Sequence, residues 1–253
     1  MKSASEPDGF NETSALARVL RGLRNLRGTP LHPQWLSDRF HALSRRRLKA
    51  LRNSKVLDIG SGDSSHAELL DSSNRLVRLD YPETNRRYSV RPDVFGDACR
   101  LPVRSEVFDA VLLLEVLEHL PCADAALEEI HRVTRPKGTL YLSVPFLYPT
   151  HDAPQDFQRY TTHGLRALLN RHRFMPIEEI QHGNSFVVGL QLINLGLLEL
   201  ARDAAKWHPL AGLSLAATAY PVCLAMNALA SPLVALRHPA AGCFGFFVVA
   251  QRN

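Results

Sequence analysis

Hydrophobic and polar positions between residues 54 and 180 follow the pattern of strands that alternate with helices. Compact apolar runs predict strands at residues 56–59, 76–80, 93–95, 108–114, 139–144 and 177–180. Apolar residues at helical spacing predict helices at residues 65–72, 123–133 and 162–172. Strands and helices in this order predict a parallel sheet with helices on both faces. A last apolar run, residues 244–250, predicts a final strand at the C-terminus.

Before the first strand, the pattern predicts a loose tail and two helices. Residues 16–26 carry apolar side chains at helical spacing, with four arginines off that face, and Gly28 and Pro30 end the pattern. A second helix is expected at residues 35–51. The first helix has two interpretations: it packs on the main domain, or it lies as a basic amphipathic helix on an anionic membrane surface.

A long apolar stretch separates the last two predicted strands. Residues 186–205 carry charges only toward their end, and residues 209–236 contain no charged residue at all. Pro221 is expected to kink any helix there, which argues against one unbroken transmembrane helix. Three interpretations remain: a helical hairpin over the active-site mouth, a membrane-embedded or membrane-surface hairpin, and a dimerisation surface. The basic N-terminal helix favours the membrane interpretation, because this helix and the apolar stretch would both contact the same membrane surface.

These patterns predict four segments. Residues 1–53 form a tail and helical extension, and residues 54–185 form an α/β core. Residues 186–240 form an apolar helical insertion, and residues 241–253 return to the core as its final strand.

Acidic residues follow successive predicted strands. Asp58 lies near the end of the first predicted strand, and Gly60 and Gly62 lie in the turn after it, where glycines let the backbone turn sharply and approach a ligand. Asp80 ends the next strand about 20 residues on, the position of a ribose-binding acid in nucleotide-binding folds. Asp97 and Glu115 follow later strands. Because ligands bind at the carboxyl edge of such sheets, we expect these acids to border one ligand site.

The ordered set of motifs resembles one family. The set comprises residues 56–62 (VLDIGSG), Asp80, residues 96–98 (GDA) with 101–102 (LP), residues 108–109 (FD), residues 115–120 (EVLEHL) and residues 135–138 (RPKG). It is similar to the class I S-adenosylmethionine-dependent methyltransferases, in the type 11 branch, over residues 54–180 and the final strand. The resemblance implies a Rossmann-like seven-stranded sheet, methyl transfer, and S-adenosylmethionine as the cofactor.

The resemblance also implies roles for individual residues. Gly60, Ser61 and Gly62 would border the methionine part of the donor, and Glu115 would lie near the methionine or the transferring methyl. The remaining implied donor-binding residues are Asp80 at the ribose, Asp97 and Ala98 at the adenine edge, and Asp58 and Tyr81 beside them. After Gly62 this sequence has Asp63, Ser64 and Ser65, where many members of the family carry a small residue or another glycine. Ser65 also stands where a dinucleotide-binding motif needs its third glycine, so that alternative is disfavoured.

Two histidines are candidate general bases. His119 follows the fourth main strand, and His151 lies in the proline-rich loop after the next one. A hydroxyl acceptor loses a proton as it attacks, and an imidazole suits that transfer near neutral pH. In the same loop we expect Asp156, Arg159 and Tyr160 to bind the acceptor. The alternative is that an Asp156–Arg159 ion pair and a Thr161 helix cap only order the loop.

The net charge and the spacing of the cysteines limit which partners, metal sites and cellular compartments we expect. The net charge is +5 and the pI about 9.2, but no aromatic residues interleave with the basic clusters, so nucleic acid is an improbable partner. The four cysteines form no C-x-x-C pair, which argues against a zinc site and against disulfides and fits a reducing compartment. We therefore expect no metal and a cytoplasmic protein, with membrane association on the cytoplasmic face left open.

The predicted reaction is methylation of a small or lipid-linked acceptor, such as a glycan or lipid precursor, at an oxygen, with nitrogen and carbon as the less favoured acceptor atoms. Two alternatives stay open: a methyltransferase of soluble metabolites, and a non-catalytic protein that keeps the donor pocket as a scaffold. The acceptor and the oligomeric state cannot be read from these patterns.

Overall fold

The computed structural model describes residues 22, 26, 28–63, 66–85, 90–234 and 242–253. The chain divides into two compact units. The hairpin unit comprises the described residues of 1–40 and 183–242, and the core unit comprises those of 41–182 and 243–253. The basic N-terminal helix predicted at residues 16–26 falls almost entirely outside the described residues.

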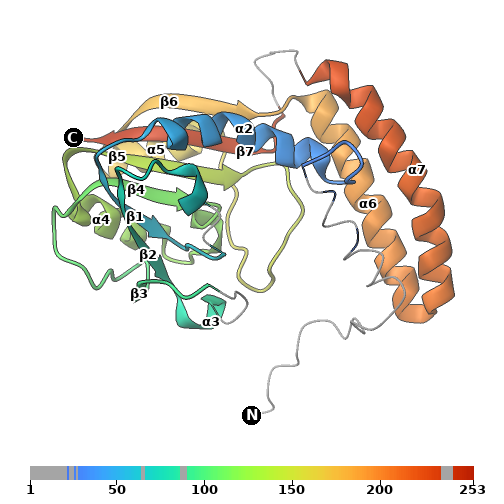
Figure 1. Cartoon of the computed structure of the whole chain (residues 1–253), viewed down its shortest axis with the longest axis horizontal. Helices are drawn as coiled ribbons and strands as arrows, with labels where there is room; N and C mark the ends of the chain where they lie inside the picture. Colours follow the sequence, from blue (N-terminus) through green and yellow to red (C-terminus); the bar gives the residue numbers. More distant parts are fainter. Residues whose placement is uncertain (1–21, 23–25, 27, 64–65, 86–89, 235–241) are drawn as a thin grey trace, which may run out of the picture. The chain divides into compact units, whose positions relative to one another are not determined.

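Seven strands build one sheet in the core unit (Figure 1). Their order is β3-β2-β1-β4-β5-β7-β6, and every neighbouring pair is parallel except those made by β7, which runs antiparallel to β5 and β6. The strands are β1 (Lys55–Ile59), β2 (Arg75–Asp80), β3 (Val94–Phe95), β4 (Phe108–Leu114), β5 (Thr134–Pro145), β6 (Phe174–His182) and β7 (Gly245–Arg252). This is the predicted Rossmann-like methyltransferase sheet.

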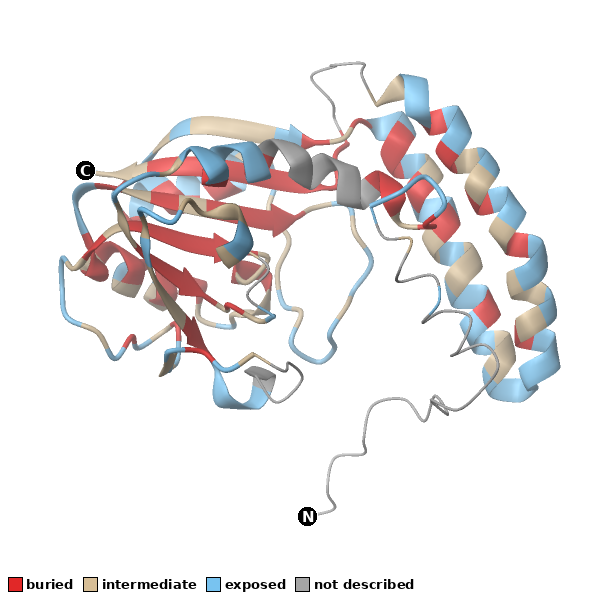
Figure 2. Cartoon of the chain, viewed as in Figure 1, coloured by how far each residue is buried: buried red, intermediate tan, exposed pale blue. Residues whose placement is uncertain are grey.

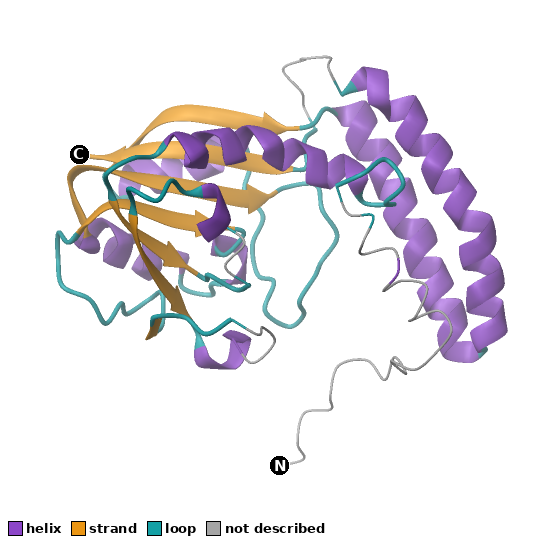
Figure 3. Cartoon of the chain, in the orientation of Figure 1, coloured by secondary structure: helices purple, strands orange, loops and turns teal. Residues whose placement is uncertain are grey.

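Helices cover both faces of the sheet, as the alternating pattern predicted (Figure 3). On one face, buried residues of α4 (Ala123–Val133) and α5 (Thr162–Arg171) share a core with Leu57. On the other, Leu48 from α2 (Trp35–Ala50) packs with Val56. Successive residues of β1 thus serve opposite cores, which is why the strand is apolar throughout.

The helix predicted at residues 65–72 is not found in the described part of that segment. Only a 3-10 turn, η1 (Ala67–Leu69), is present. Asp71 accepts hydrogen bonds from the backbone of Ser73 and Asn74, and this local turn leads directly into β2. Short polar side chains that bond nearby backbone compete with helix formation, and the apolar spacing alone did not reveal this.

The hairpin unit contains two long antiparallel helices, α6 (Ser185–Trp207) and α7 (Pro209–Leu233). α7 continues through Pro221 without a break, contrary to the expectation that this proline argues against one unbroken helix. A proline inside a helix removes one backbone hydrogen bond. At Gly212 the two backbones approach so closely that an added Cβ would lie 2.4 Å from the Ala205 side chain.

Amide side chains inside the hairpin unit bind the chain segment before α2. Asn227 of α7 donates to the carbonyls of Pro30 and His32, and accepts a bond from Asn194 of α6. Gln191 and Asn194 both donate to the carbonyl of Pro33. These buried bonds fix residues 30–33 against both helices, since a buried amide left without a partner costs about 1–3 kcal/mol.

Two cysteines contradict the expectation of a disulfide-free chain. Cys99 and Cys122 form a disulfide, while Cys223 and Cys243 are buried free thiols. The sequence spacing of 23 residues gave no sign of the pair. The two residues meet because one follows β3 and the other follows β4, at the same edge of the sheet.

Candidate functional site

The turn after β1 depends on two glycines. Gly60 and Gly62 adopt φ values of +70° and +51°, a region that disfavours residues with a side chain. The amides of Gly60 and Ser61 both donate to the carbonyl of Leu79 on the neighbouring strand. A Cβ at Gly60 would lie 2.5 Å from Cγ2 of Val116, which follows β4. The turn therefore lies between β1 and β4, where the strand order reverses and ligands bind in such sheets.

Asp80 links this turn to the end of β2. Its Oδ2 accepts the amide of Gly62 at 2.9 Å, and its Oδ1 accepts the amide of Tyr81 at 2.7 Å. The side chain is buried, whereas Tyr81 is half exposed. Each carboxylate oxygen keeps a second lone pair after these bonds. Asp80 thus has a structural role, and the ribose contact expected of it remains a prediction.

Asp58 is a buried acid without a complete set of partners. Its Oδ2 and the Oγ of its neighbour Ser61 are both buried and lack a hydrogen-bond partner. Burial, and then the negative charge of Asp80, raises the pKa of Asp58 from 3.8 to about 7. Buried polar groups are almost always satisfied, so these two atoms indicate a place that a polar or cationic group fills.

Replacing Asp58 with asparagine should flatten the dependence of stability on pH. Because the pKa is higher in the folded state, the folded chain binds more protons between pH 3.8 and about 7. The contribution of Asp58 to the free energy of unfolding therefore falls as pH rises through that interval, by about 2 kcal/mol from about pH 5 to 7. Urea unfolding of the wild type and the variant at about pH 5 and about pH 7 measures this change in the free energy of unfolding. An identical pH dependence in both proteins would contradict the assignment.

The other residues predicted to bind the donor lie at the same carboxyl edge of the sheet as Asp58 and Asp80. Asp97 is exposed, and its Oδ1 accepts the amide of Cys99, while Ala98 is buried. Glu115 adopts φ of +54°, and its amide faces both the carbonyl and the hydroxyl of Ser143 on β5. Asp58 lies inside β1 and Asp80 ends β2, whereas Asp97 and Glu115 follow β3 and β4. Their contacts with a donor remain predictions.

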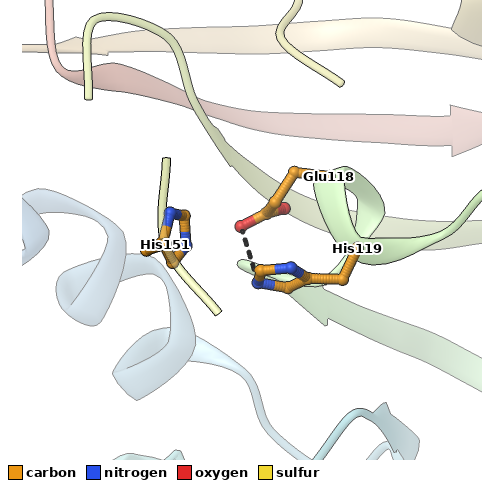
Figure 4. A group of neighbouring side chains, drawn as sticks. All are labelled: Glu118, His119 and His151. Atoms are coloured by element: carbon orange, nitrogen blue, oxygen red, sulfur yellow. Dashed lines mark ion pairs between the residues drawn. The ribbon is translucent and has the colours of Figure 1, made fainter. Parts of the chain in front are cut away.

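Both candidate bases lie close together, beside a buried glutamate (Figure 4). The rings of His119 and His151 are 5.0 Å apart and meet edge to face. Nε2 of His119 lies 3.7 Å from Oε1 of Glu118, whose side chain is fully buried. Burial first, and then the charge of Glu115, raises the pKa of Glu118 to about 9. The sequence predicts no separate role for Glu118, which lies within the motif of residues 115–120, because nothing in a single sequence shows that its carboxyl is buried.

Asp156 orients His151 in the loop of residues 146–161. Its Oδ2 accepts the amide of His151 at 2.9 Å and lies 3.4 Å from Nδ1 of the same residue. Arg159 makes a two-pronged ion pair with this carboxylate, which holds the pKa of Asp156 well below its ordinary value. The Asp156 side chain is nearly buried, so its available contacts are those that order the loop.

Three further bonds attach this loop to η2 (Leu117–His119). Phe157 donates its amide to the carbonyl of Glu118, Gln158 donates to Leu120, and Nδ1 of His119 contacts the carbonyl of Gln155. The loop is therefore held beside the end of β4. This arrangement brings His151 to His119 although 31 residues separate them in the sequence.

The predicted loop-ordering contacts are present. Thr161 caps α5 by accepting the amide of Gly164, and the Asp156–Arg159 ion pair forms as described. Tyr160 donates its hydroxyl to Gln158, and burial raises its pKa to about 12. Acceptor binding by Asp156, Arg159 and Tyr160 remains a prediction.

Sequence comparison supports the methyltransferase resemblance over part of the chain. Residues 57–142 match the family described as a methyltransferase domain. A demethylmenaquinone methyltransferase of Mycobacterium sp. (strain JLS) is 40% identical over 104 residues, which cover 39% of this chain and 44% of that protein. The chain therefore matches less than half the length of this curated relative.

Solved structures share the fold. A putative sarcosine dimethylglycine methyltransferase from Galdieria sulphuraria is 13% identical, covers 87% of this chain and 84% of that chain, and gives a TM-score of 0.50. An S-adenosylmethionine-dependent methyltransferase from Mesorhizobium loti is 13% identical, covers 84% and 98%, and also gives 0.50. The match of residues 57–142 to the methyltransferase-domain family, together with the sheet order and the glycine turn, identifies a class I S-adenosylmethionine-dependent methyltransferase domain in this chain.

Proposed function

We propose that the chain transfers a methyl group from S-adenosylmethionine to an oxygen of a lipid-like acceptor. The observation that carries the donor assignment is the turn after β1, where Gly60 and Gly62 adopt positive φ beside the unpartnered oxygen atoms of Asp58 and Ser61. The methyl-accepting chemistry rests on His151 and the carboxylate of Asp156.

The residues of the turn suit the donor. Asp58, Asp80, Asp97 and Glu115 are acids, and the donor carries positive charge on its ammonium and sulfonium groups. Gly60 and Gly62 offer backbone without side chains, which permits close approach. When bound, S-adenosylmethionine supplies an electrophilic methyl on a good leaving group. Alignment and exclusion of water are then the main tasks left to the chain.

His151 is the favoured general base. Nδ1 of His151 faces two acceptors, the carbonyl of Pro149 at 3.3 Å and Oδ2 of Asp156 at 3.4 Å, so the neutral ring keeps its proton on Nδ1 and a lone pair on Nε2. This leaves Nε2 to remove the proton of an acceptor hydroxyl, a step that contributes about 10²–10⁴-fold to the rate in known cases. Asp156 acts here as a positioning residue.

The hairpin unit supports a lipid-like acceptor. Helices α6 and α7 have 23 and 25 residues, about 35 Å each, enough to cross the roughly 30 Å apolar core of a bilayer. Only 28% and 22% of their most apolar windows are buried, so they are not core helices of this unit (Figure 2). Phe186 and Trp207 are 72% and 93% exposed. The demethylmenaquinone named in the relatives is an acceptor of the kind such a hairpin would serve.

Two glutamates in the hairpin should release the chain from membranes. Ile193 and Val222 are exposed near the middle of α6 and α7, so Ile193→Glu with Val222→Glu costs little in water. In a bilayer each charge costs about 2.5–3.5 kcal/mol. We expect the wild-type chain to sediment with lipid vesicles after a high-salt wash and the variant to stay in the supernatant. Ile177→Glu on β6, equally exposed, is the matched control and should still sediment.

Recovery of the wild-type chain in the supernatant without detergent would contradict membrane embedding. The catalytic part of the proposal has its own test, which is calorimetric titration with S-adenosylmethionine followed by turnover with a panel of hydroxylated quinones and lipids. Absence of S-adenosylmethionine binding would contradict the proposal. Binding without turnover on every acceptor would favour the non-catalytic scaffold.

A further inference from the structure

We propose that Glu118, His119 and His151 form a binding site for a divalent transition-metal ion, with Zn²⁺ as the representative (Figure 4). Each residue offers one ligand atom, and these atoms all lie within 4.8 Å of one another. Two imidazoles and one carboxylate are a common ligand set for catalytic zinc and for iron, and they leave coordination positions open.

The hydrogen bonds around the two histidines orient both rings for a metal. Nδ1 of His119 faces the carbonyl of Gln155, and Nδ1 of His151 lies 3.4 Å from the carboxylate of Asp156. A metal-ligating histidine usually directs its other ring nitrogen to a carbonyl or a carboxylate, which fixes the tautomer. Both rings therefore keep Nε2 as the ligand atom, and this outer layer of partners is already in place.

Glu118 supplies the independent observation that points to a cation. Its side chain is fully buried, and neither Oε1 nor Oε2 has a hydrogen-bond partner. A buried carboxyl with both oxygens unsatisfied is rare in folded proteins and is unfavourable unless something occupies the position beside it. A metal ion would compensate the buried charge, whereas the nearby cation Arg159 already binds Asp156.

The distances require only a small closure. Ligands about 2.0–2.2 Å from a tetrahedral zinc lie about 3.4 Å from each other. Oε1 of Glu118 and Nε2 of His119 are already 3.7 Å apart. Because no two of the ligand atoms are more than 4.8 Å apart, a movement of at most about 1.4 Å by the loop that carries His151 would complete the site. Two imidazole ligands favour Zn²⁺ over Mg²⁺ or Ca²⁺, which prefer oxygen ligands only.

The ion would change the role of His151. While Nε2 binds metal it cannot remove a proton, and an open coordination position could instead bind and acidify the acceptor oxygen. This consequence rests on the proposed methyl transfer. The metal site itself does not, since its test measures binding alone.

The experiment is titration of Zn²⁺ into chelator-treated, purified protein by calorimetry, with Co²⁺ absorption as a second readout. We expect one ion per chain in the wild type and a loss of affinity of at least about tenfold in Glu118→Gln, His119→Ala and His151→Ala. His163→Ala, an exposed histidine on α5, is the matched control and should bind like the wild type. Circular dichroism and S-adenosylmethionine titration show that each variant is folded.

Absence of saturable one-to-one binding in the wild type would overturn the site. Equal affinity in the wild type and all three ligand variants would do the same, because the ion would then bind elsewhere. Donor binding that persists in either outcome leaves the proposed methyltransferase activity standing, so the two proposals fail separately.

Discussion

Replacing Gly60 with alanine should weaken S-adenosylmethionine binding by about 100-fold. The backbone at Gly60 has φ of +70°, which costs an L-residue about 1–2 kcal/mol. The new methyl would also lie 2.5 Å from Cγ2 of Val116, an overpacking that costs about 1–3 kcal/mol. Together these terms amount to about 2–5 kcal/mol, a range that includes the roughly 2.7 kcal/mol of a 100-fold loss, and the turn relieves them by leaving the conformation that binds the donor. Calorimetric titration with the donor measures the effect.

A second variant separates the two causes. Adding Val116→Ala to Gly60→Ala removes the clash and leaves the backbone strain, so about tenfold of the affinity should return. Gly189→Ala is the control, because no atom lies within 4 Å of the added methyl and the position is helical. Donor affinity within a few-fold of the wild type in Gly60→Ala would show that the turn does not contact the donor.

The sheet could be predicted from sequence because its signals are local. β4 is apolar at nearly every position, since both its faces are buried, and Asp58, Asp80 and Glu115 mark strand ends directly. The helix at residues 65–72 could not be excluded this way. There the apolar spacing is helical, but turn bonds to Asp71 decide the conformation.

The candidate site was predicted only in part, because it depends on contacts between distant segments. His119 and His151 were each recognised from their positions after strands, but their proximity follows from the loop bonds to Glu118 and Leu120. The Cys99–Cys122 disulfide could not be predicted for the same reason, because it joins residues that follow different strands. A single sequence shows which residues end strands, but it does not show which loops meet.

Replacing His151 with alanine should lower kcat by about 10²–10⁴-fold and leave the dissociation constant of S-adenosylmethionine within about threefold of the wild type. The acceptor hydroxyl would lose its base, whereas the donor turn after β1 would be unchanged. Formation of S-adenosylhomocysteine under donor saturation measures kcat, and calorimetry measures donor affinity. His163→Ala, exposed on α5 and outside the loop of residues 146–161, is the control and should retain full turnover.

Asp156→Asn tests how the base is held. The variant keeps the imidazole but weakens the partner at Nδ1 and the pair with Arg159. We expect a smaller loss of kcat than in His151→Ala, because the imidazole remains and only one of the two acceptors at its Nδ1 is weakened. Assays with and without a chelator then separate base from metal ligand: a loss in His151→Ala that persists after chelation belongs to the base. Turnover that survives His151→Ala under both conditions would remove this histidine from the mechanism.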